Sequence, residues 1–366
     1  MHALKRFGTA FGGYKMMENY PVPGCGPDDI ILEIKAAAIC GADMKHWGVD
    51  NGYDDTNITP DQQQSVRGHE FAGEIVKVGE NVKDWHIGQR VVSDNSAHVC
   101  GVCPACEQGD FLCCEHKVNL GLDNNTWGGG FSKYCKVPGE ILAIHKHAIW
   151  EIPEGIKYEE ACVLDPICNA YKAVAQQSHL IPGQDVVVFG TGPLGLFSVQ
   201  VAKLMGAVNI VMVGLDDDVK VRFGVAKELG ATHCVNGSKE DVVARCTEIC
   251  GRDNLGLVIE CSGANIALKQ AIEMTRPNAE IVRVGMGFKP LEFSINDITA
   301  WNKSIIGHMA YDSTSWRNCI RLLQSGQIKV QPMITHRLGL SQWQEGFDKM
   351  AKKEAIKVIF HYDYED

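Results

Sequence analysis

The stretch that most constrains the fold is a short apolar run leading directly into a glycine-rich turn. Residues 185–189 read Asp-Val-Val-Val-Phe, which is typical of a buried strand in a parallel sheet. The turn at 190–195, Gly-Thr-Gly-Pro-Leu-Gly, follows, then an apolar-periodic helix and a second apolar run at 209–213. Glycines let backbone approach a pyrophosphate, and a helix N-terminus supplies oriented N–H groups. The pattern therefore predicts a dinucleotide-binding βαβ unit.

Further apolar runs at 257–261, 280–285 and 303–307 extend this unit into a doubly wound parallel sheet. The residues predicted to contact the cofactor lie in the glycine turn and after the later strands: Gly190, Gly192, Pro193, Leu194, Gly195, Asp216 and Gly285.

The position after the second strand distinguishes NAD from NADP. An acid that binds the ribose hydroxyls is expected there, but Gly214 occupies it and three aspartates follow at 216–218. These carboxylates would repel the 2′-phosphate of NADP, so we expect NAD. If NADP were used instead, Arg222 or Lys220 would be the phosphate partner.

Composition limits the class of protein. With 366 residues and 45% hydrophobic content, the chain is long enough for two domains, since single cores stop growing near roughly 250–300 residues. A net charge of −10 without a basic run argues against nucleic acid as a partner. No apolar run approaches the roughly 20 residues of a membrane helix, and the N-terminus lacks a signal-peptide core. We expect a cytoplasmic protein whose fifteen cysteines are metal ligands and small buried residues.

Cysteines at 100, 103 and 106, with Cys113 and Cys114 after a gap, form the most specific metal signal in the chain. Short spacers let four thiolates converge on one ion with little loop-closure entropy. Four sulfur ligands leave no position for substrate, so this pattern predicts a structural zinc site. Spacing alone leaves Cys113 and Cys114 as alternatives for the fourth ligand.

A second group of candidate ligands is dispersed. His69 and Glu70 stand side by side before the alternating run 74–78, and Cys40 follows the apolar run 28–39. A thiolate, an imidazole and a carboxylate are the ligand types of a catalytic zinc. The competing interpretation is a hydrogen-bonded histidine and a small buried cysteine.

Two aspartates are candidate supporting residues for this site. Asp43 either accepts the free ring N–H of a ligating histidine or belongs to a turn. Asp165 precedes Pro166, a position unfavourable for helix, so we expect it at a helix boundary. There it would complete the metal site or cap the following helix.

Taken together, these motifs resemble the zinc-dependent medium-chain alcohol dehydrogenase superfamily over the whole chain. The resemblance is nearest to its polyol (sorbitol-like) and threonine dehydrogenase branches. It rests on Cys40-Gly41-x-Asp43, Gly68-His69-Glu70-x2-Gly73-x5-Gly79-x2-Val82, the cysteines at 100, 103, 106 and 114, the glycine turn, and Asp165-Pro166-x2-Asn169-Ala170.

The resemblance implies an α/β protein of two domains. A GroES-like, β-rich catalytic domain would span 1–164 and 327–366, and a Rossmann domain 165–326. Each chain would bind one catalytic and one structural zinc. The implied catalytic ligands are Cys40, His69 and Glu70, with Asp165 bound directly or through water, and the implied structural ligands are Cys100, Cys103, Cys106 and Cys114.

The expected activity is oxidation of a secondary alcohol with NAD, aided by zinc as a Lewis acid. A polyol or sugar-derived alcohol is the first substrate expected, and a hydroxy amino acid such as threonine the second. Ala42 departs from the family because many relatives carry there the serine or threonine that takes the substrate proton. Lys45, His46 or a water held by Glu70 would replace it. A non-catalytic zinc- and dinucleotide-binding protein is the rival class, and a homodimer or homotetramer is expected.

Overall fold

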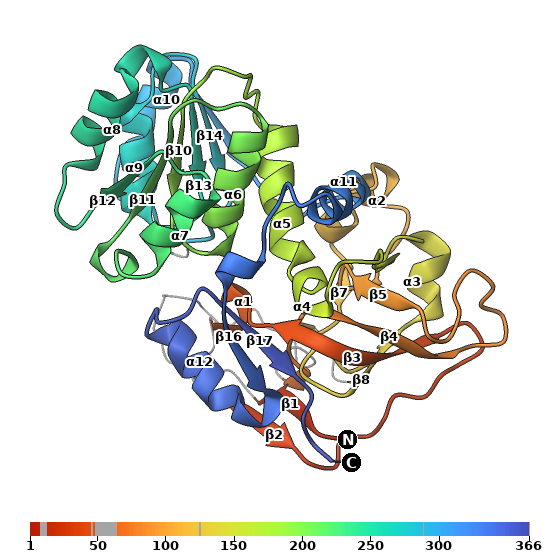
Figure 1. Ribbon diagram of the computed structural model, residues 1–366. Helices are drawn as coiled ribbons and strands as arrows, with labels where there is room; N and C mark the ends of the chain where they lie inside the picture. Colours follow the sequence, from red (N-terminus) through yellow and green to blue (C-terminus); the bar gives the residue numbers. More distant parts are fainter. Residues whose placement is uncertain (8–12, 45–46, 48–63, 124–125, 288, 366) are drawn as a thin grey trace. The chain divides into compact units, whose positions relative to one another are not determined.

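The computed structural model describes residues 1–7, 13–44, 47, 64–123, 126–287 and 289–365 (Figure 1). The chain forms two compact units. The first comprises Met1–Asp165, Asp312–Thr314 and Ile334–Asp366, and the second Pro166–Tyr311 and Ser315–Met333. The chain leaves the first unit after residue 165, one residue later than the expected domain boundary after residue 164. It re-enters the first unit for the last time after residue 333, where the expected boundary followed residue 326.

The second unit is built on a six-stranded parallel sheet in the order β12-β11-β10-β13-β14-β15. Strand order reverses between β10 and β13, and in such sheets ligands bind beyond the carboxyl ends of the strands at this reversal. The predicted doubly wound sheet is therefore confirmed. Its strands are β10 (Val186–Phe189), β11 (Ile210–Gly214), β12 (His233–Asn236), β13 (Leu257–Glu260), β14 (Glu280–Arg283) and β15 (Ser304–Gly307).

Helices cover this sheet and bury its apolar strands. Successive side chains of a strand point to opposite faces, and all four residues of β10 are buried. Val187 and Phe189 share a core cluster with α8 (Val242–Cys250) and α9 (Asn265–Met274). Helix α6 (Pro193–Leu204) packs on β10, β11 and β13. The remaining helices are α7 (Arg222–Leu229), α10 (Asn296–Ala300) and α11 (Ser313–Gln324).

Helix α5 (Leu164–Tyr171) begins earlier than the sequence predicts. Asp165 lies at the helix boundary as expected, but inside the first turn together with Pro166, so the expectation that it is not helical is wrong. Proline is tolerated there since the first N–H groups of a helix have no partner within it. The helix continues as a π-helical turn, Lys172–Gln177.

The first unit contains a seven-stranded sheet in the order β16-β17-β3-β4-β5-β9, with β8 paired to β3. Pairing is antiparallel except between β16 and β17. The C-terminal strand β17 pairs with β3, so the tail of the chain does return to the first domain as expected. The strands are β3 (Ile30–Ala38), β4 (Glu70–Val78), β5 (Arg90–Ser93), β8 (Tyr134–Val137), β9 (Ile149–Glu151), β16 (Ile334–Gly339) and β17 (Lys357–His361).

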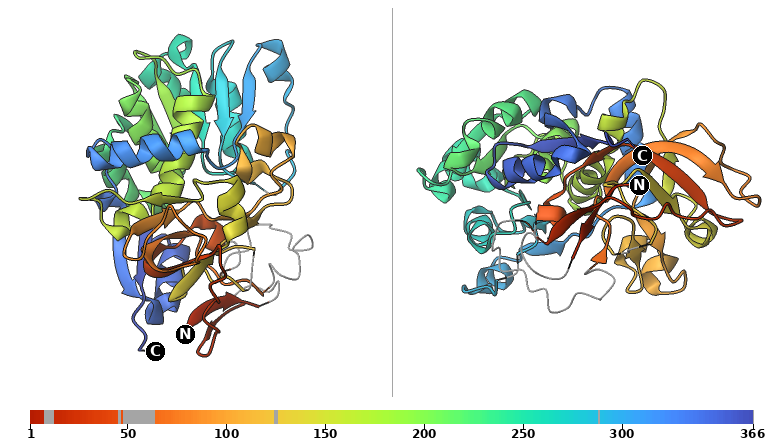
Figure 2. Two further views of the ribbon diagram at one scale, coloured as in Figure 1. Left: turned by 90° about the vertical axis from the view of Figure 1, so that its right-hand side faces the viewer. Right: turned by 90° about the horizontal axis from the view of Figure 1, so that it is seen from below.

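Smaller elements complete this unit. Strands β1 (Ala3–Arg6) and β2 (Tyr14–Met17) form a hairpin, and β6 (Ser96–His98) pairs with β7 (Val118–Asn119). The two ends of the described chain lie side by side, where the His2 ring stacks on Tyr364 at 3.9 Å (Figure 2). The helices of this unit are α1 (Gly41–Met44), α2 (Pro104–Glu107), α3 (Gly139–Ile144), α4 (Tyr158–Ala161) and α12 (Trp343–Ala351).

Among the helices that the structure describes, none combines the length and apolar character required to cross a bilayer.

Candidate metal and cofactor sites

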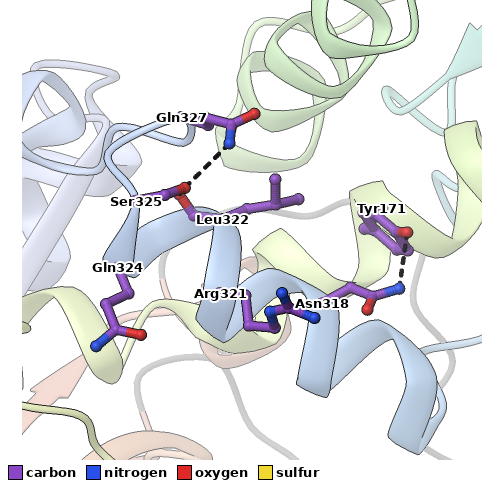
Figure 3. Close-up of a pocket in the computed structure, with 7 residues that line it drawn as sticks. All are labelled: Tyr171, Asn318, Arg321, Leu322, Gln324, Ser325 and Gln327. Atoms are coloured by element: carbon purple, nitrogen blue, oxygen red, sulfur yellow. Dashed lines mark hydrogen bonds between the residues drawn. The ribbon is translucent and has the colours of Figure 1, made fainter.

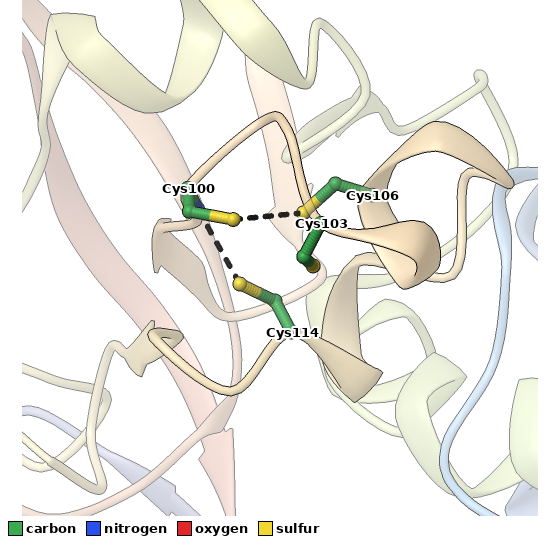
Figure 4. Close-up of side chains that lie close together, drawn as sticks. All are labelled: Cys100, Cys103, Cys106 and Cys114. Atoms are coloured by element: carbon green, nitrogen blue, oxygen red, sulfur yellow. Dashed lines mark hydrogen bonds between the residues drawn. The ribbon is translucent and has the colours of Figure 1, made fainter.

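Four cysteines converge in the first unit. The sulfur atoms of Cys100, Cys103, Cys106 and Cys114 all lie within 4.8 Å of one another (Figure 4). Cys103 is the N-cap of α2, Cys106 lies within that helix, and Cys114 follows the 3-10 turn Phe111–Cys113. Cys113 is exposed and outside the cluster, so the geometry favours Cys114 as the fourth ligand, and this choice stays a prediction.

The chemistry of this cluster fits a closed zinc site. A hydrogen bond from the Val102 backbone N–H lowers the pKa of Cys100 to about 6, which favours the thiolate that binds metal. Burial raises the pKa of Cys106 to about 12, so that thiol needs a cation to lose its proton. Four converging sulfur donors match tetrahedral zinc and leave no exchangeable position.

We expect Cys103→Ser to lose one zinc per chain and to lower the melting temperature. A structural zinc contributes directly to folding, and a serine hydroxyl is a far weaker ligand than a thiolate. Metal analysis by mass spectrometry and thermal unfolding would measure both effects. Cys113→Ser is the matched control, because Cys113 is the exposed neighbour of the cluster. Retention of two zinc ions by Cys103→Ser would contradict this assignment.

The second group of candidate ligands also converges. Ligand atoms of Cys40, His69 and Glu70 lie within 4.8 Å of one another. Sheet pairing explains this, because β3 and β4 are antiparallel and Ala38 pairs with Glu70. Cys40 therefore follows the end of β3 at the level where His69 and Glu70 enter β4. Gly68 makes the turn before them with φ +89°, and a Cβ there would lie 2.6 Å from the Phe131 ring.

Buried atoms without partners are the observation that makes this cluster fit a metal ion. His69 is 5% and Glu70 1% exposed. Within the described residues, Nδ1 of His69 and Oε1 of Glu70 make no hydrogen bond. Unsatisfied buried polar atoms are costly, and they are explained where a cation is the missing partner. Burial also raises the pKa of the Cys40 thiol, although the nearby Lys357 acts against that rise.

Asp43 stands behind the cluster in the place predicted for a supporting carboxylate. It is fully buried in α1 and accepts a hydrogen bond from the Cys40 backbone N–H at 3.0 Å. Its Oδ1 lies 3.4 Å from the Arg67 guanidinium and 3.9 Å from Nδ1 of His69. Asp43 thus faces His69 at longer than hydrogen-bond distance, and its positioning role stays a prediction.

Lys357 is a site residue that the sequence reasoning missed. It lies on β17, is 1% exposed, and its ammonium donates to Oε2 of Glu70 and to the Ile39 carbonyl. Burial alone would lower the pKa of Lys357, but the Glu70 and Cys40 charges outweigh it and raise that pKa. A lysine inside the otherwise apolar run 356–360 was the available signal, since buried lysines occur almost only when paired.

Asp165 is not part of the three-residue cluster formed by described residues. Asn95 donates its amide N–H to Oδ2 of Asp165 at 3.1 Å, while the Asp165 charge still acts on the pKa values of Cys40 and Glu70. Metal binding by Asp165 therefore stays a prediction. Ala42 lies in α1, whereas Lys45 and His46 fall outside the described residues.

In the second unit, the glycine turn joins β10 to α6 at the point where strand order reverses. Gly190 has φ +92°, and a Cβ on Gly195 would lie 1.8 Å from the Gly190 carbonyl oxygen, so both positions require glycine. Gly192 is the N-cap of α6 and provides no side-chain cap, and Pro193 begins the helix. The N–H groups of Leu194 and Gly195, in the first turn of the helix, are thus available to a phosphate, which is the fit expected for a dinucleotide.

The two other predicted cofactor residues have different surroundings. Gly285 follows β14, where a Cβ would lie 2.2 Å from the Gly263 backbone nitrogen, so glycine there permits close packing of two turns. Asp216 is exposed, and its carboxylate accepts a hydrogen bond from Asn236 at 2.7 Å and pairs with Lys239 at 3.1 Å. The hydrogen bond from Asn236, and to a smaller extent the one from Lys239, lowers the pKa of the Asp216 carboxyl.

A separate cavity of about 560 Å³ lies on α11 and the end of α5, and none of the predicted site residues lines it (Figure 3). Its wall includes a hydrogen bond from Asn318 to the Tyr171 hydroxyl at 2.9 Å. The lining residues are Tyr171, Asn318, Arg321, Leu322, Gln324, Ser325 and Gln327.

Comparison with known proteins agrees with this arrangement. Residues 26–147 match the alcohol dehydrogenase GroES-like domain, and residues 193–325 match the zinc-binding dehydrogenase family. An uncharacterized zinc-type alcohol dehydrogenase-like protein of Escherichia coli K12 is 77% identical over the full length of both chains. The sorbitol dehydrogenase of Halalkalibacterium halodurans is 30% identical over 98% of both. The crystal structure of 2R,3R-butanediol dehydrogenase from Bacillus subtilis has a TM-score of 0.84 at 29% identity, covering 99% of both chains.

These matches confirm the resemblance and the fold expected from it. The chain belongs to the zinc-dependent medium-chain alcohol dehydrogenase superfamily and is an oxidoreductase acting on CH–OH groups.

Proposed function

We propose that this protein oxidises a secondary alcohol of the polyol or sugar-derived class to a ketone, with zinc and NAD. The observation that carries this is the cluster of Cys40, His69 and Glu70, with buried atoms of His69 and Glu70 that lack partners within the described residues. Relatives named sorbitol dehydrogenase and butanediol dehydrogenase support the choice of a polyol.

The residues in and around the cluster would have different roles. Cys40, His69 and Glu70 would hold the ion, which supplies Lewis-acid chemistry when bound. Asp43 orients the Cys40 backbone through its N–H and faces the His69 ring. Lys357 holds Oε2 of Glu70, which leaves Oε1 as the atom that contacts the ion or takes up a proton. A water held by Glu70 would take the place of the hydroxyl missing at Ala42, and Glu70 lies within the described residues, whereas Lys45 and His46 do not.

A substrate panel tests this function. Purified protein would be offered polyols, sugar acids, sugar phosphates and threonine with each nicotinamide cofactor, and reduced cofactor would be followed at 340 nm. Steady turnover with a polyol supports the proposal, and a preference for threonine would favour the alternative substrate. A zinc-loaded protein that binds the cofactor yet turns over no alcohol in the panel would favour the rival, a non-catalytic zinc- and dinucleotide-binding protein.

NAD is expected to be the better cofactor because Asp216, Asp217 and Asp218 follow β11 and would repel a 2′-phosphate. The measurement is kcat/KM for NAD and for NADP with the best alcohol of the panel, at one ionic strength, because salt screens this repulsion. We expect kcat/KM to be at least about tenfold higher for NAD than for NADP, because repulsion between the 2′-phosphate and one carboxylate is enough to weaken binding by that factor. A preference for NADP would reject this reading and direct attention to Arg222 and Lys220.

A homodimer or homotetramer in the cytoplasm remains part of the proposal. Among described residues, β15 has no strand on its outer side and carries the exposed Ile305, and proteins usually cover such an edge. Light scattering after gel filtration would give the oligomeric state.

A further inference from the structure

The carboxyl end of β11 has no room for a side chain on its own last residue. A Cβ on Gly214 would lie 2.6 Å from Cγ2 of Thr191, 2.7 Å from the Phe223 ring and 3.0 Å from Oδ2 of Asp218. Thr191 belongs to the glycine-rich turn, so this crowded place adjoins the phosphate-binding loop. The carboxylate of Asp218, which comes from the following 3-10 turn Asp216–Asp218, fills the space beside Gly214.

Asp218 is held there by one of its two oxygen atoms. The Leu215 backbone N–H donates to Oδ2 at 2.8 Å, which ties the turn to the strand end. The other oxygen, Oδ1, lies 3.5 Å from the Arg222 guanidinium and makes no hydrogen bond with any described residue, although Asp218 is only 5% exposed. Capping the turn therefore accounts for the hydrogen bond to Oδ2. It leaves Oδ1 as a buried acceptor without a hydrogen-bond donor, and such an atom is costly unless a ligand supplies the donor.

Asp216 is the less suitable acid of the three-aspartate run. Its side chain is about half exposed, and its carboxylate is already engaged by Asn236 and Lys239. A ribose hydroxyl would have to compete with both partners. Asp218 instead offers a buried acceptor that adjoins Thr191 of the glycine turn.

We propose that Asp218, through Oδ1, accepts a hydrogen bond from a ribose hydroxyl of the adenosine half of the dinucleotide, in place of the acid missing at Gly214. This inference rests on the proposed use of NAD. A hydroxyl supplies the donor that Oδ1 lacks, whereas a 2′-phosphate would bring negative charge against a buried carboxylate. The adjacent Arg222 offsets the charge of Asp218, and removal of the carboxylate would leave its guanidinium able to attract that phosphate.

The test measures binding without any alcohol substrate. Full-length protein is titrated calorimetrically with ADP-ribose and with 2′-phospho-ADP-ribose. We expect Asp218→Asn to weaken ADP-ribose binding about tenfold, the size of one charge-assisted hydrogen bond. The same change should shift the ratio of the two dissociation constants toward the phosphorylated probe. Asp216→Asn tests the acid that the sequence predicted for this contact. Asp253→Asn, at an exposed aspartate elsewhere in the same unit, is the control and should stay within about twofold of the wild type.

A second variant leaves Asp218 itself unchanged. Gly214→Ala places a methyl group against the Asp218 carboxylate and Thr191, so it should displace the carboxylate and also weaken ADP-ribose binding. This variant carries the test if circular dichroism shows that Asp218→Asn does not fold. Wild-type affinity for ADP-ribose in Asp218→Asn, or a loss confined to Asp216→Asn, would overturn the assignment. Failure of the wild type to bind either probe would instead reject the dinucleotide proposal on which the assignment rests.

Discussion

His69→Ala is expected to lose the catalytic zinc and alcohol oxidation together. The imidazole is one of three ligand types in the cluster, and Cys40 and Glu70 alone cannot hold a zinc ion with an open position. Because the ion supplies the Lewis acid, kcat/KM should fall by at least about a thousandfold, a barrier increase on the order of 4 kcal/mol. The measurement is zinc content per chain beside steady-state kinetics.

The control for this variant is His86→Ala, since His86 is an exposed histidine of the same unit. It should keep two zinc ions and wild-type turnover. His69→Ala should still keep the zinc of the four-cysteine lobe, so that its zinc content falls from two to one. Full activity in His69→Ala, or two zinc ions retained, would show that the ligand assignment is wrong.

Among the single variants proposed, Lys357→Met is expected to lower the free energy of unfolding most. It leaves the Glu70 carboxylate buried without its ammonium partner, and breaking a buried ion pair from one side typically costs about 3–5 kcal/mol. The free energy of unfolding is measured by urea titration, with and without a chelator. The loss should be greater with the chelator, because a bound cation would partly compensate the Glu70 charge.

A double variant separates the ion pair from simple packing. Glu70→Gln with Lys357→Met removes both charges and should recover much of the stability, since no buried charge is left alone. Lys352→Met is the matched control, because Lys352 is an exposed lysine at the end of α12. This substitution should leave the free energy of unfolding nearly unchanged. If Lys357→Met alone unfolds like the wild type, Glu70 is protonated in the folded protein and the pair is not ionic.

The features that the sequence predicted best are those whose parts are close together in the chain. The glycine turn at 190–195 could be assigned because strand, turn and helix are contiguous and their glycines satisfy a local backbone requirement. The four-cysteine lobe was predictable for the same reason, since short spacers leave few arrangements other than convergence. The superfamily and both domain folds followed from such motifs and are confirmed.

The resemblance grouped Cys40 with His69 and Glu70, but the strand pairing that brings distant segments together needed the tertiary structure. Cys40 meets His69 and Glu70 because β3 and β4 pair with Ala38 opposite Glu70, a register that spacing did not reveal. Lys357 reaches Glu70 across 287 residues because β17 joins the sheet beside β3.

Even local detail depended on the fold in two places. Cys114 enters the sulfur cluster and Cys113 does not, because the 3-10 turn at 111–113 directs neighbouring side chains to opposite environments. Asp218 occupies the space beside Gly214 because Thr191 and Phe223 close that space from other elements. Sequence patterns specify backbone conformation and ligand type over short distances, whereas the partner of a buried charge is set by which strands pair and in which register.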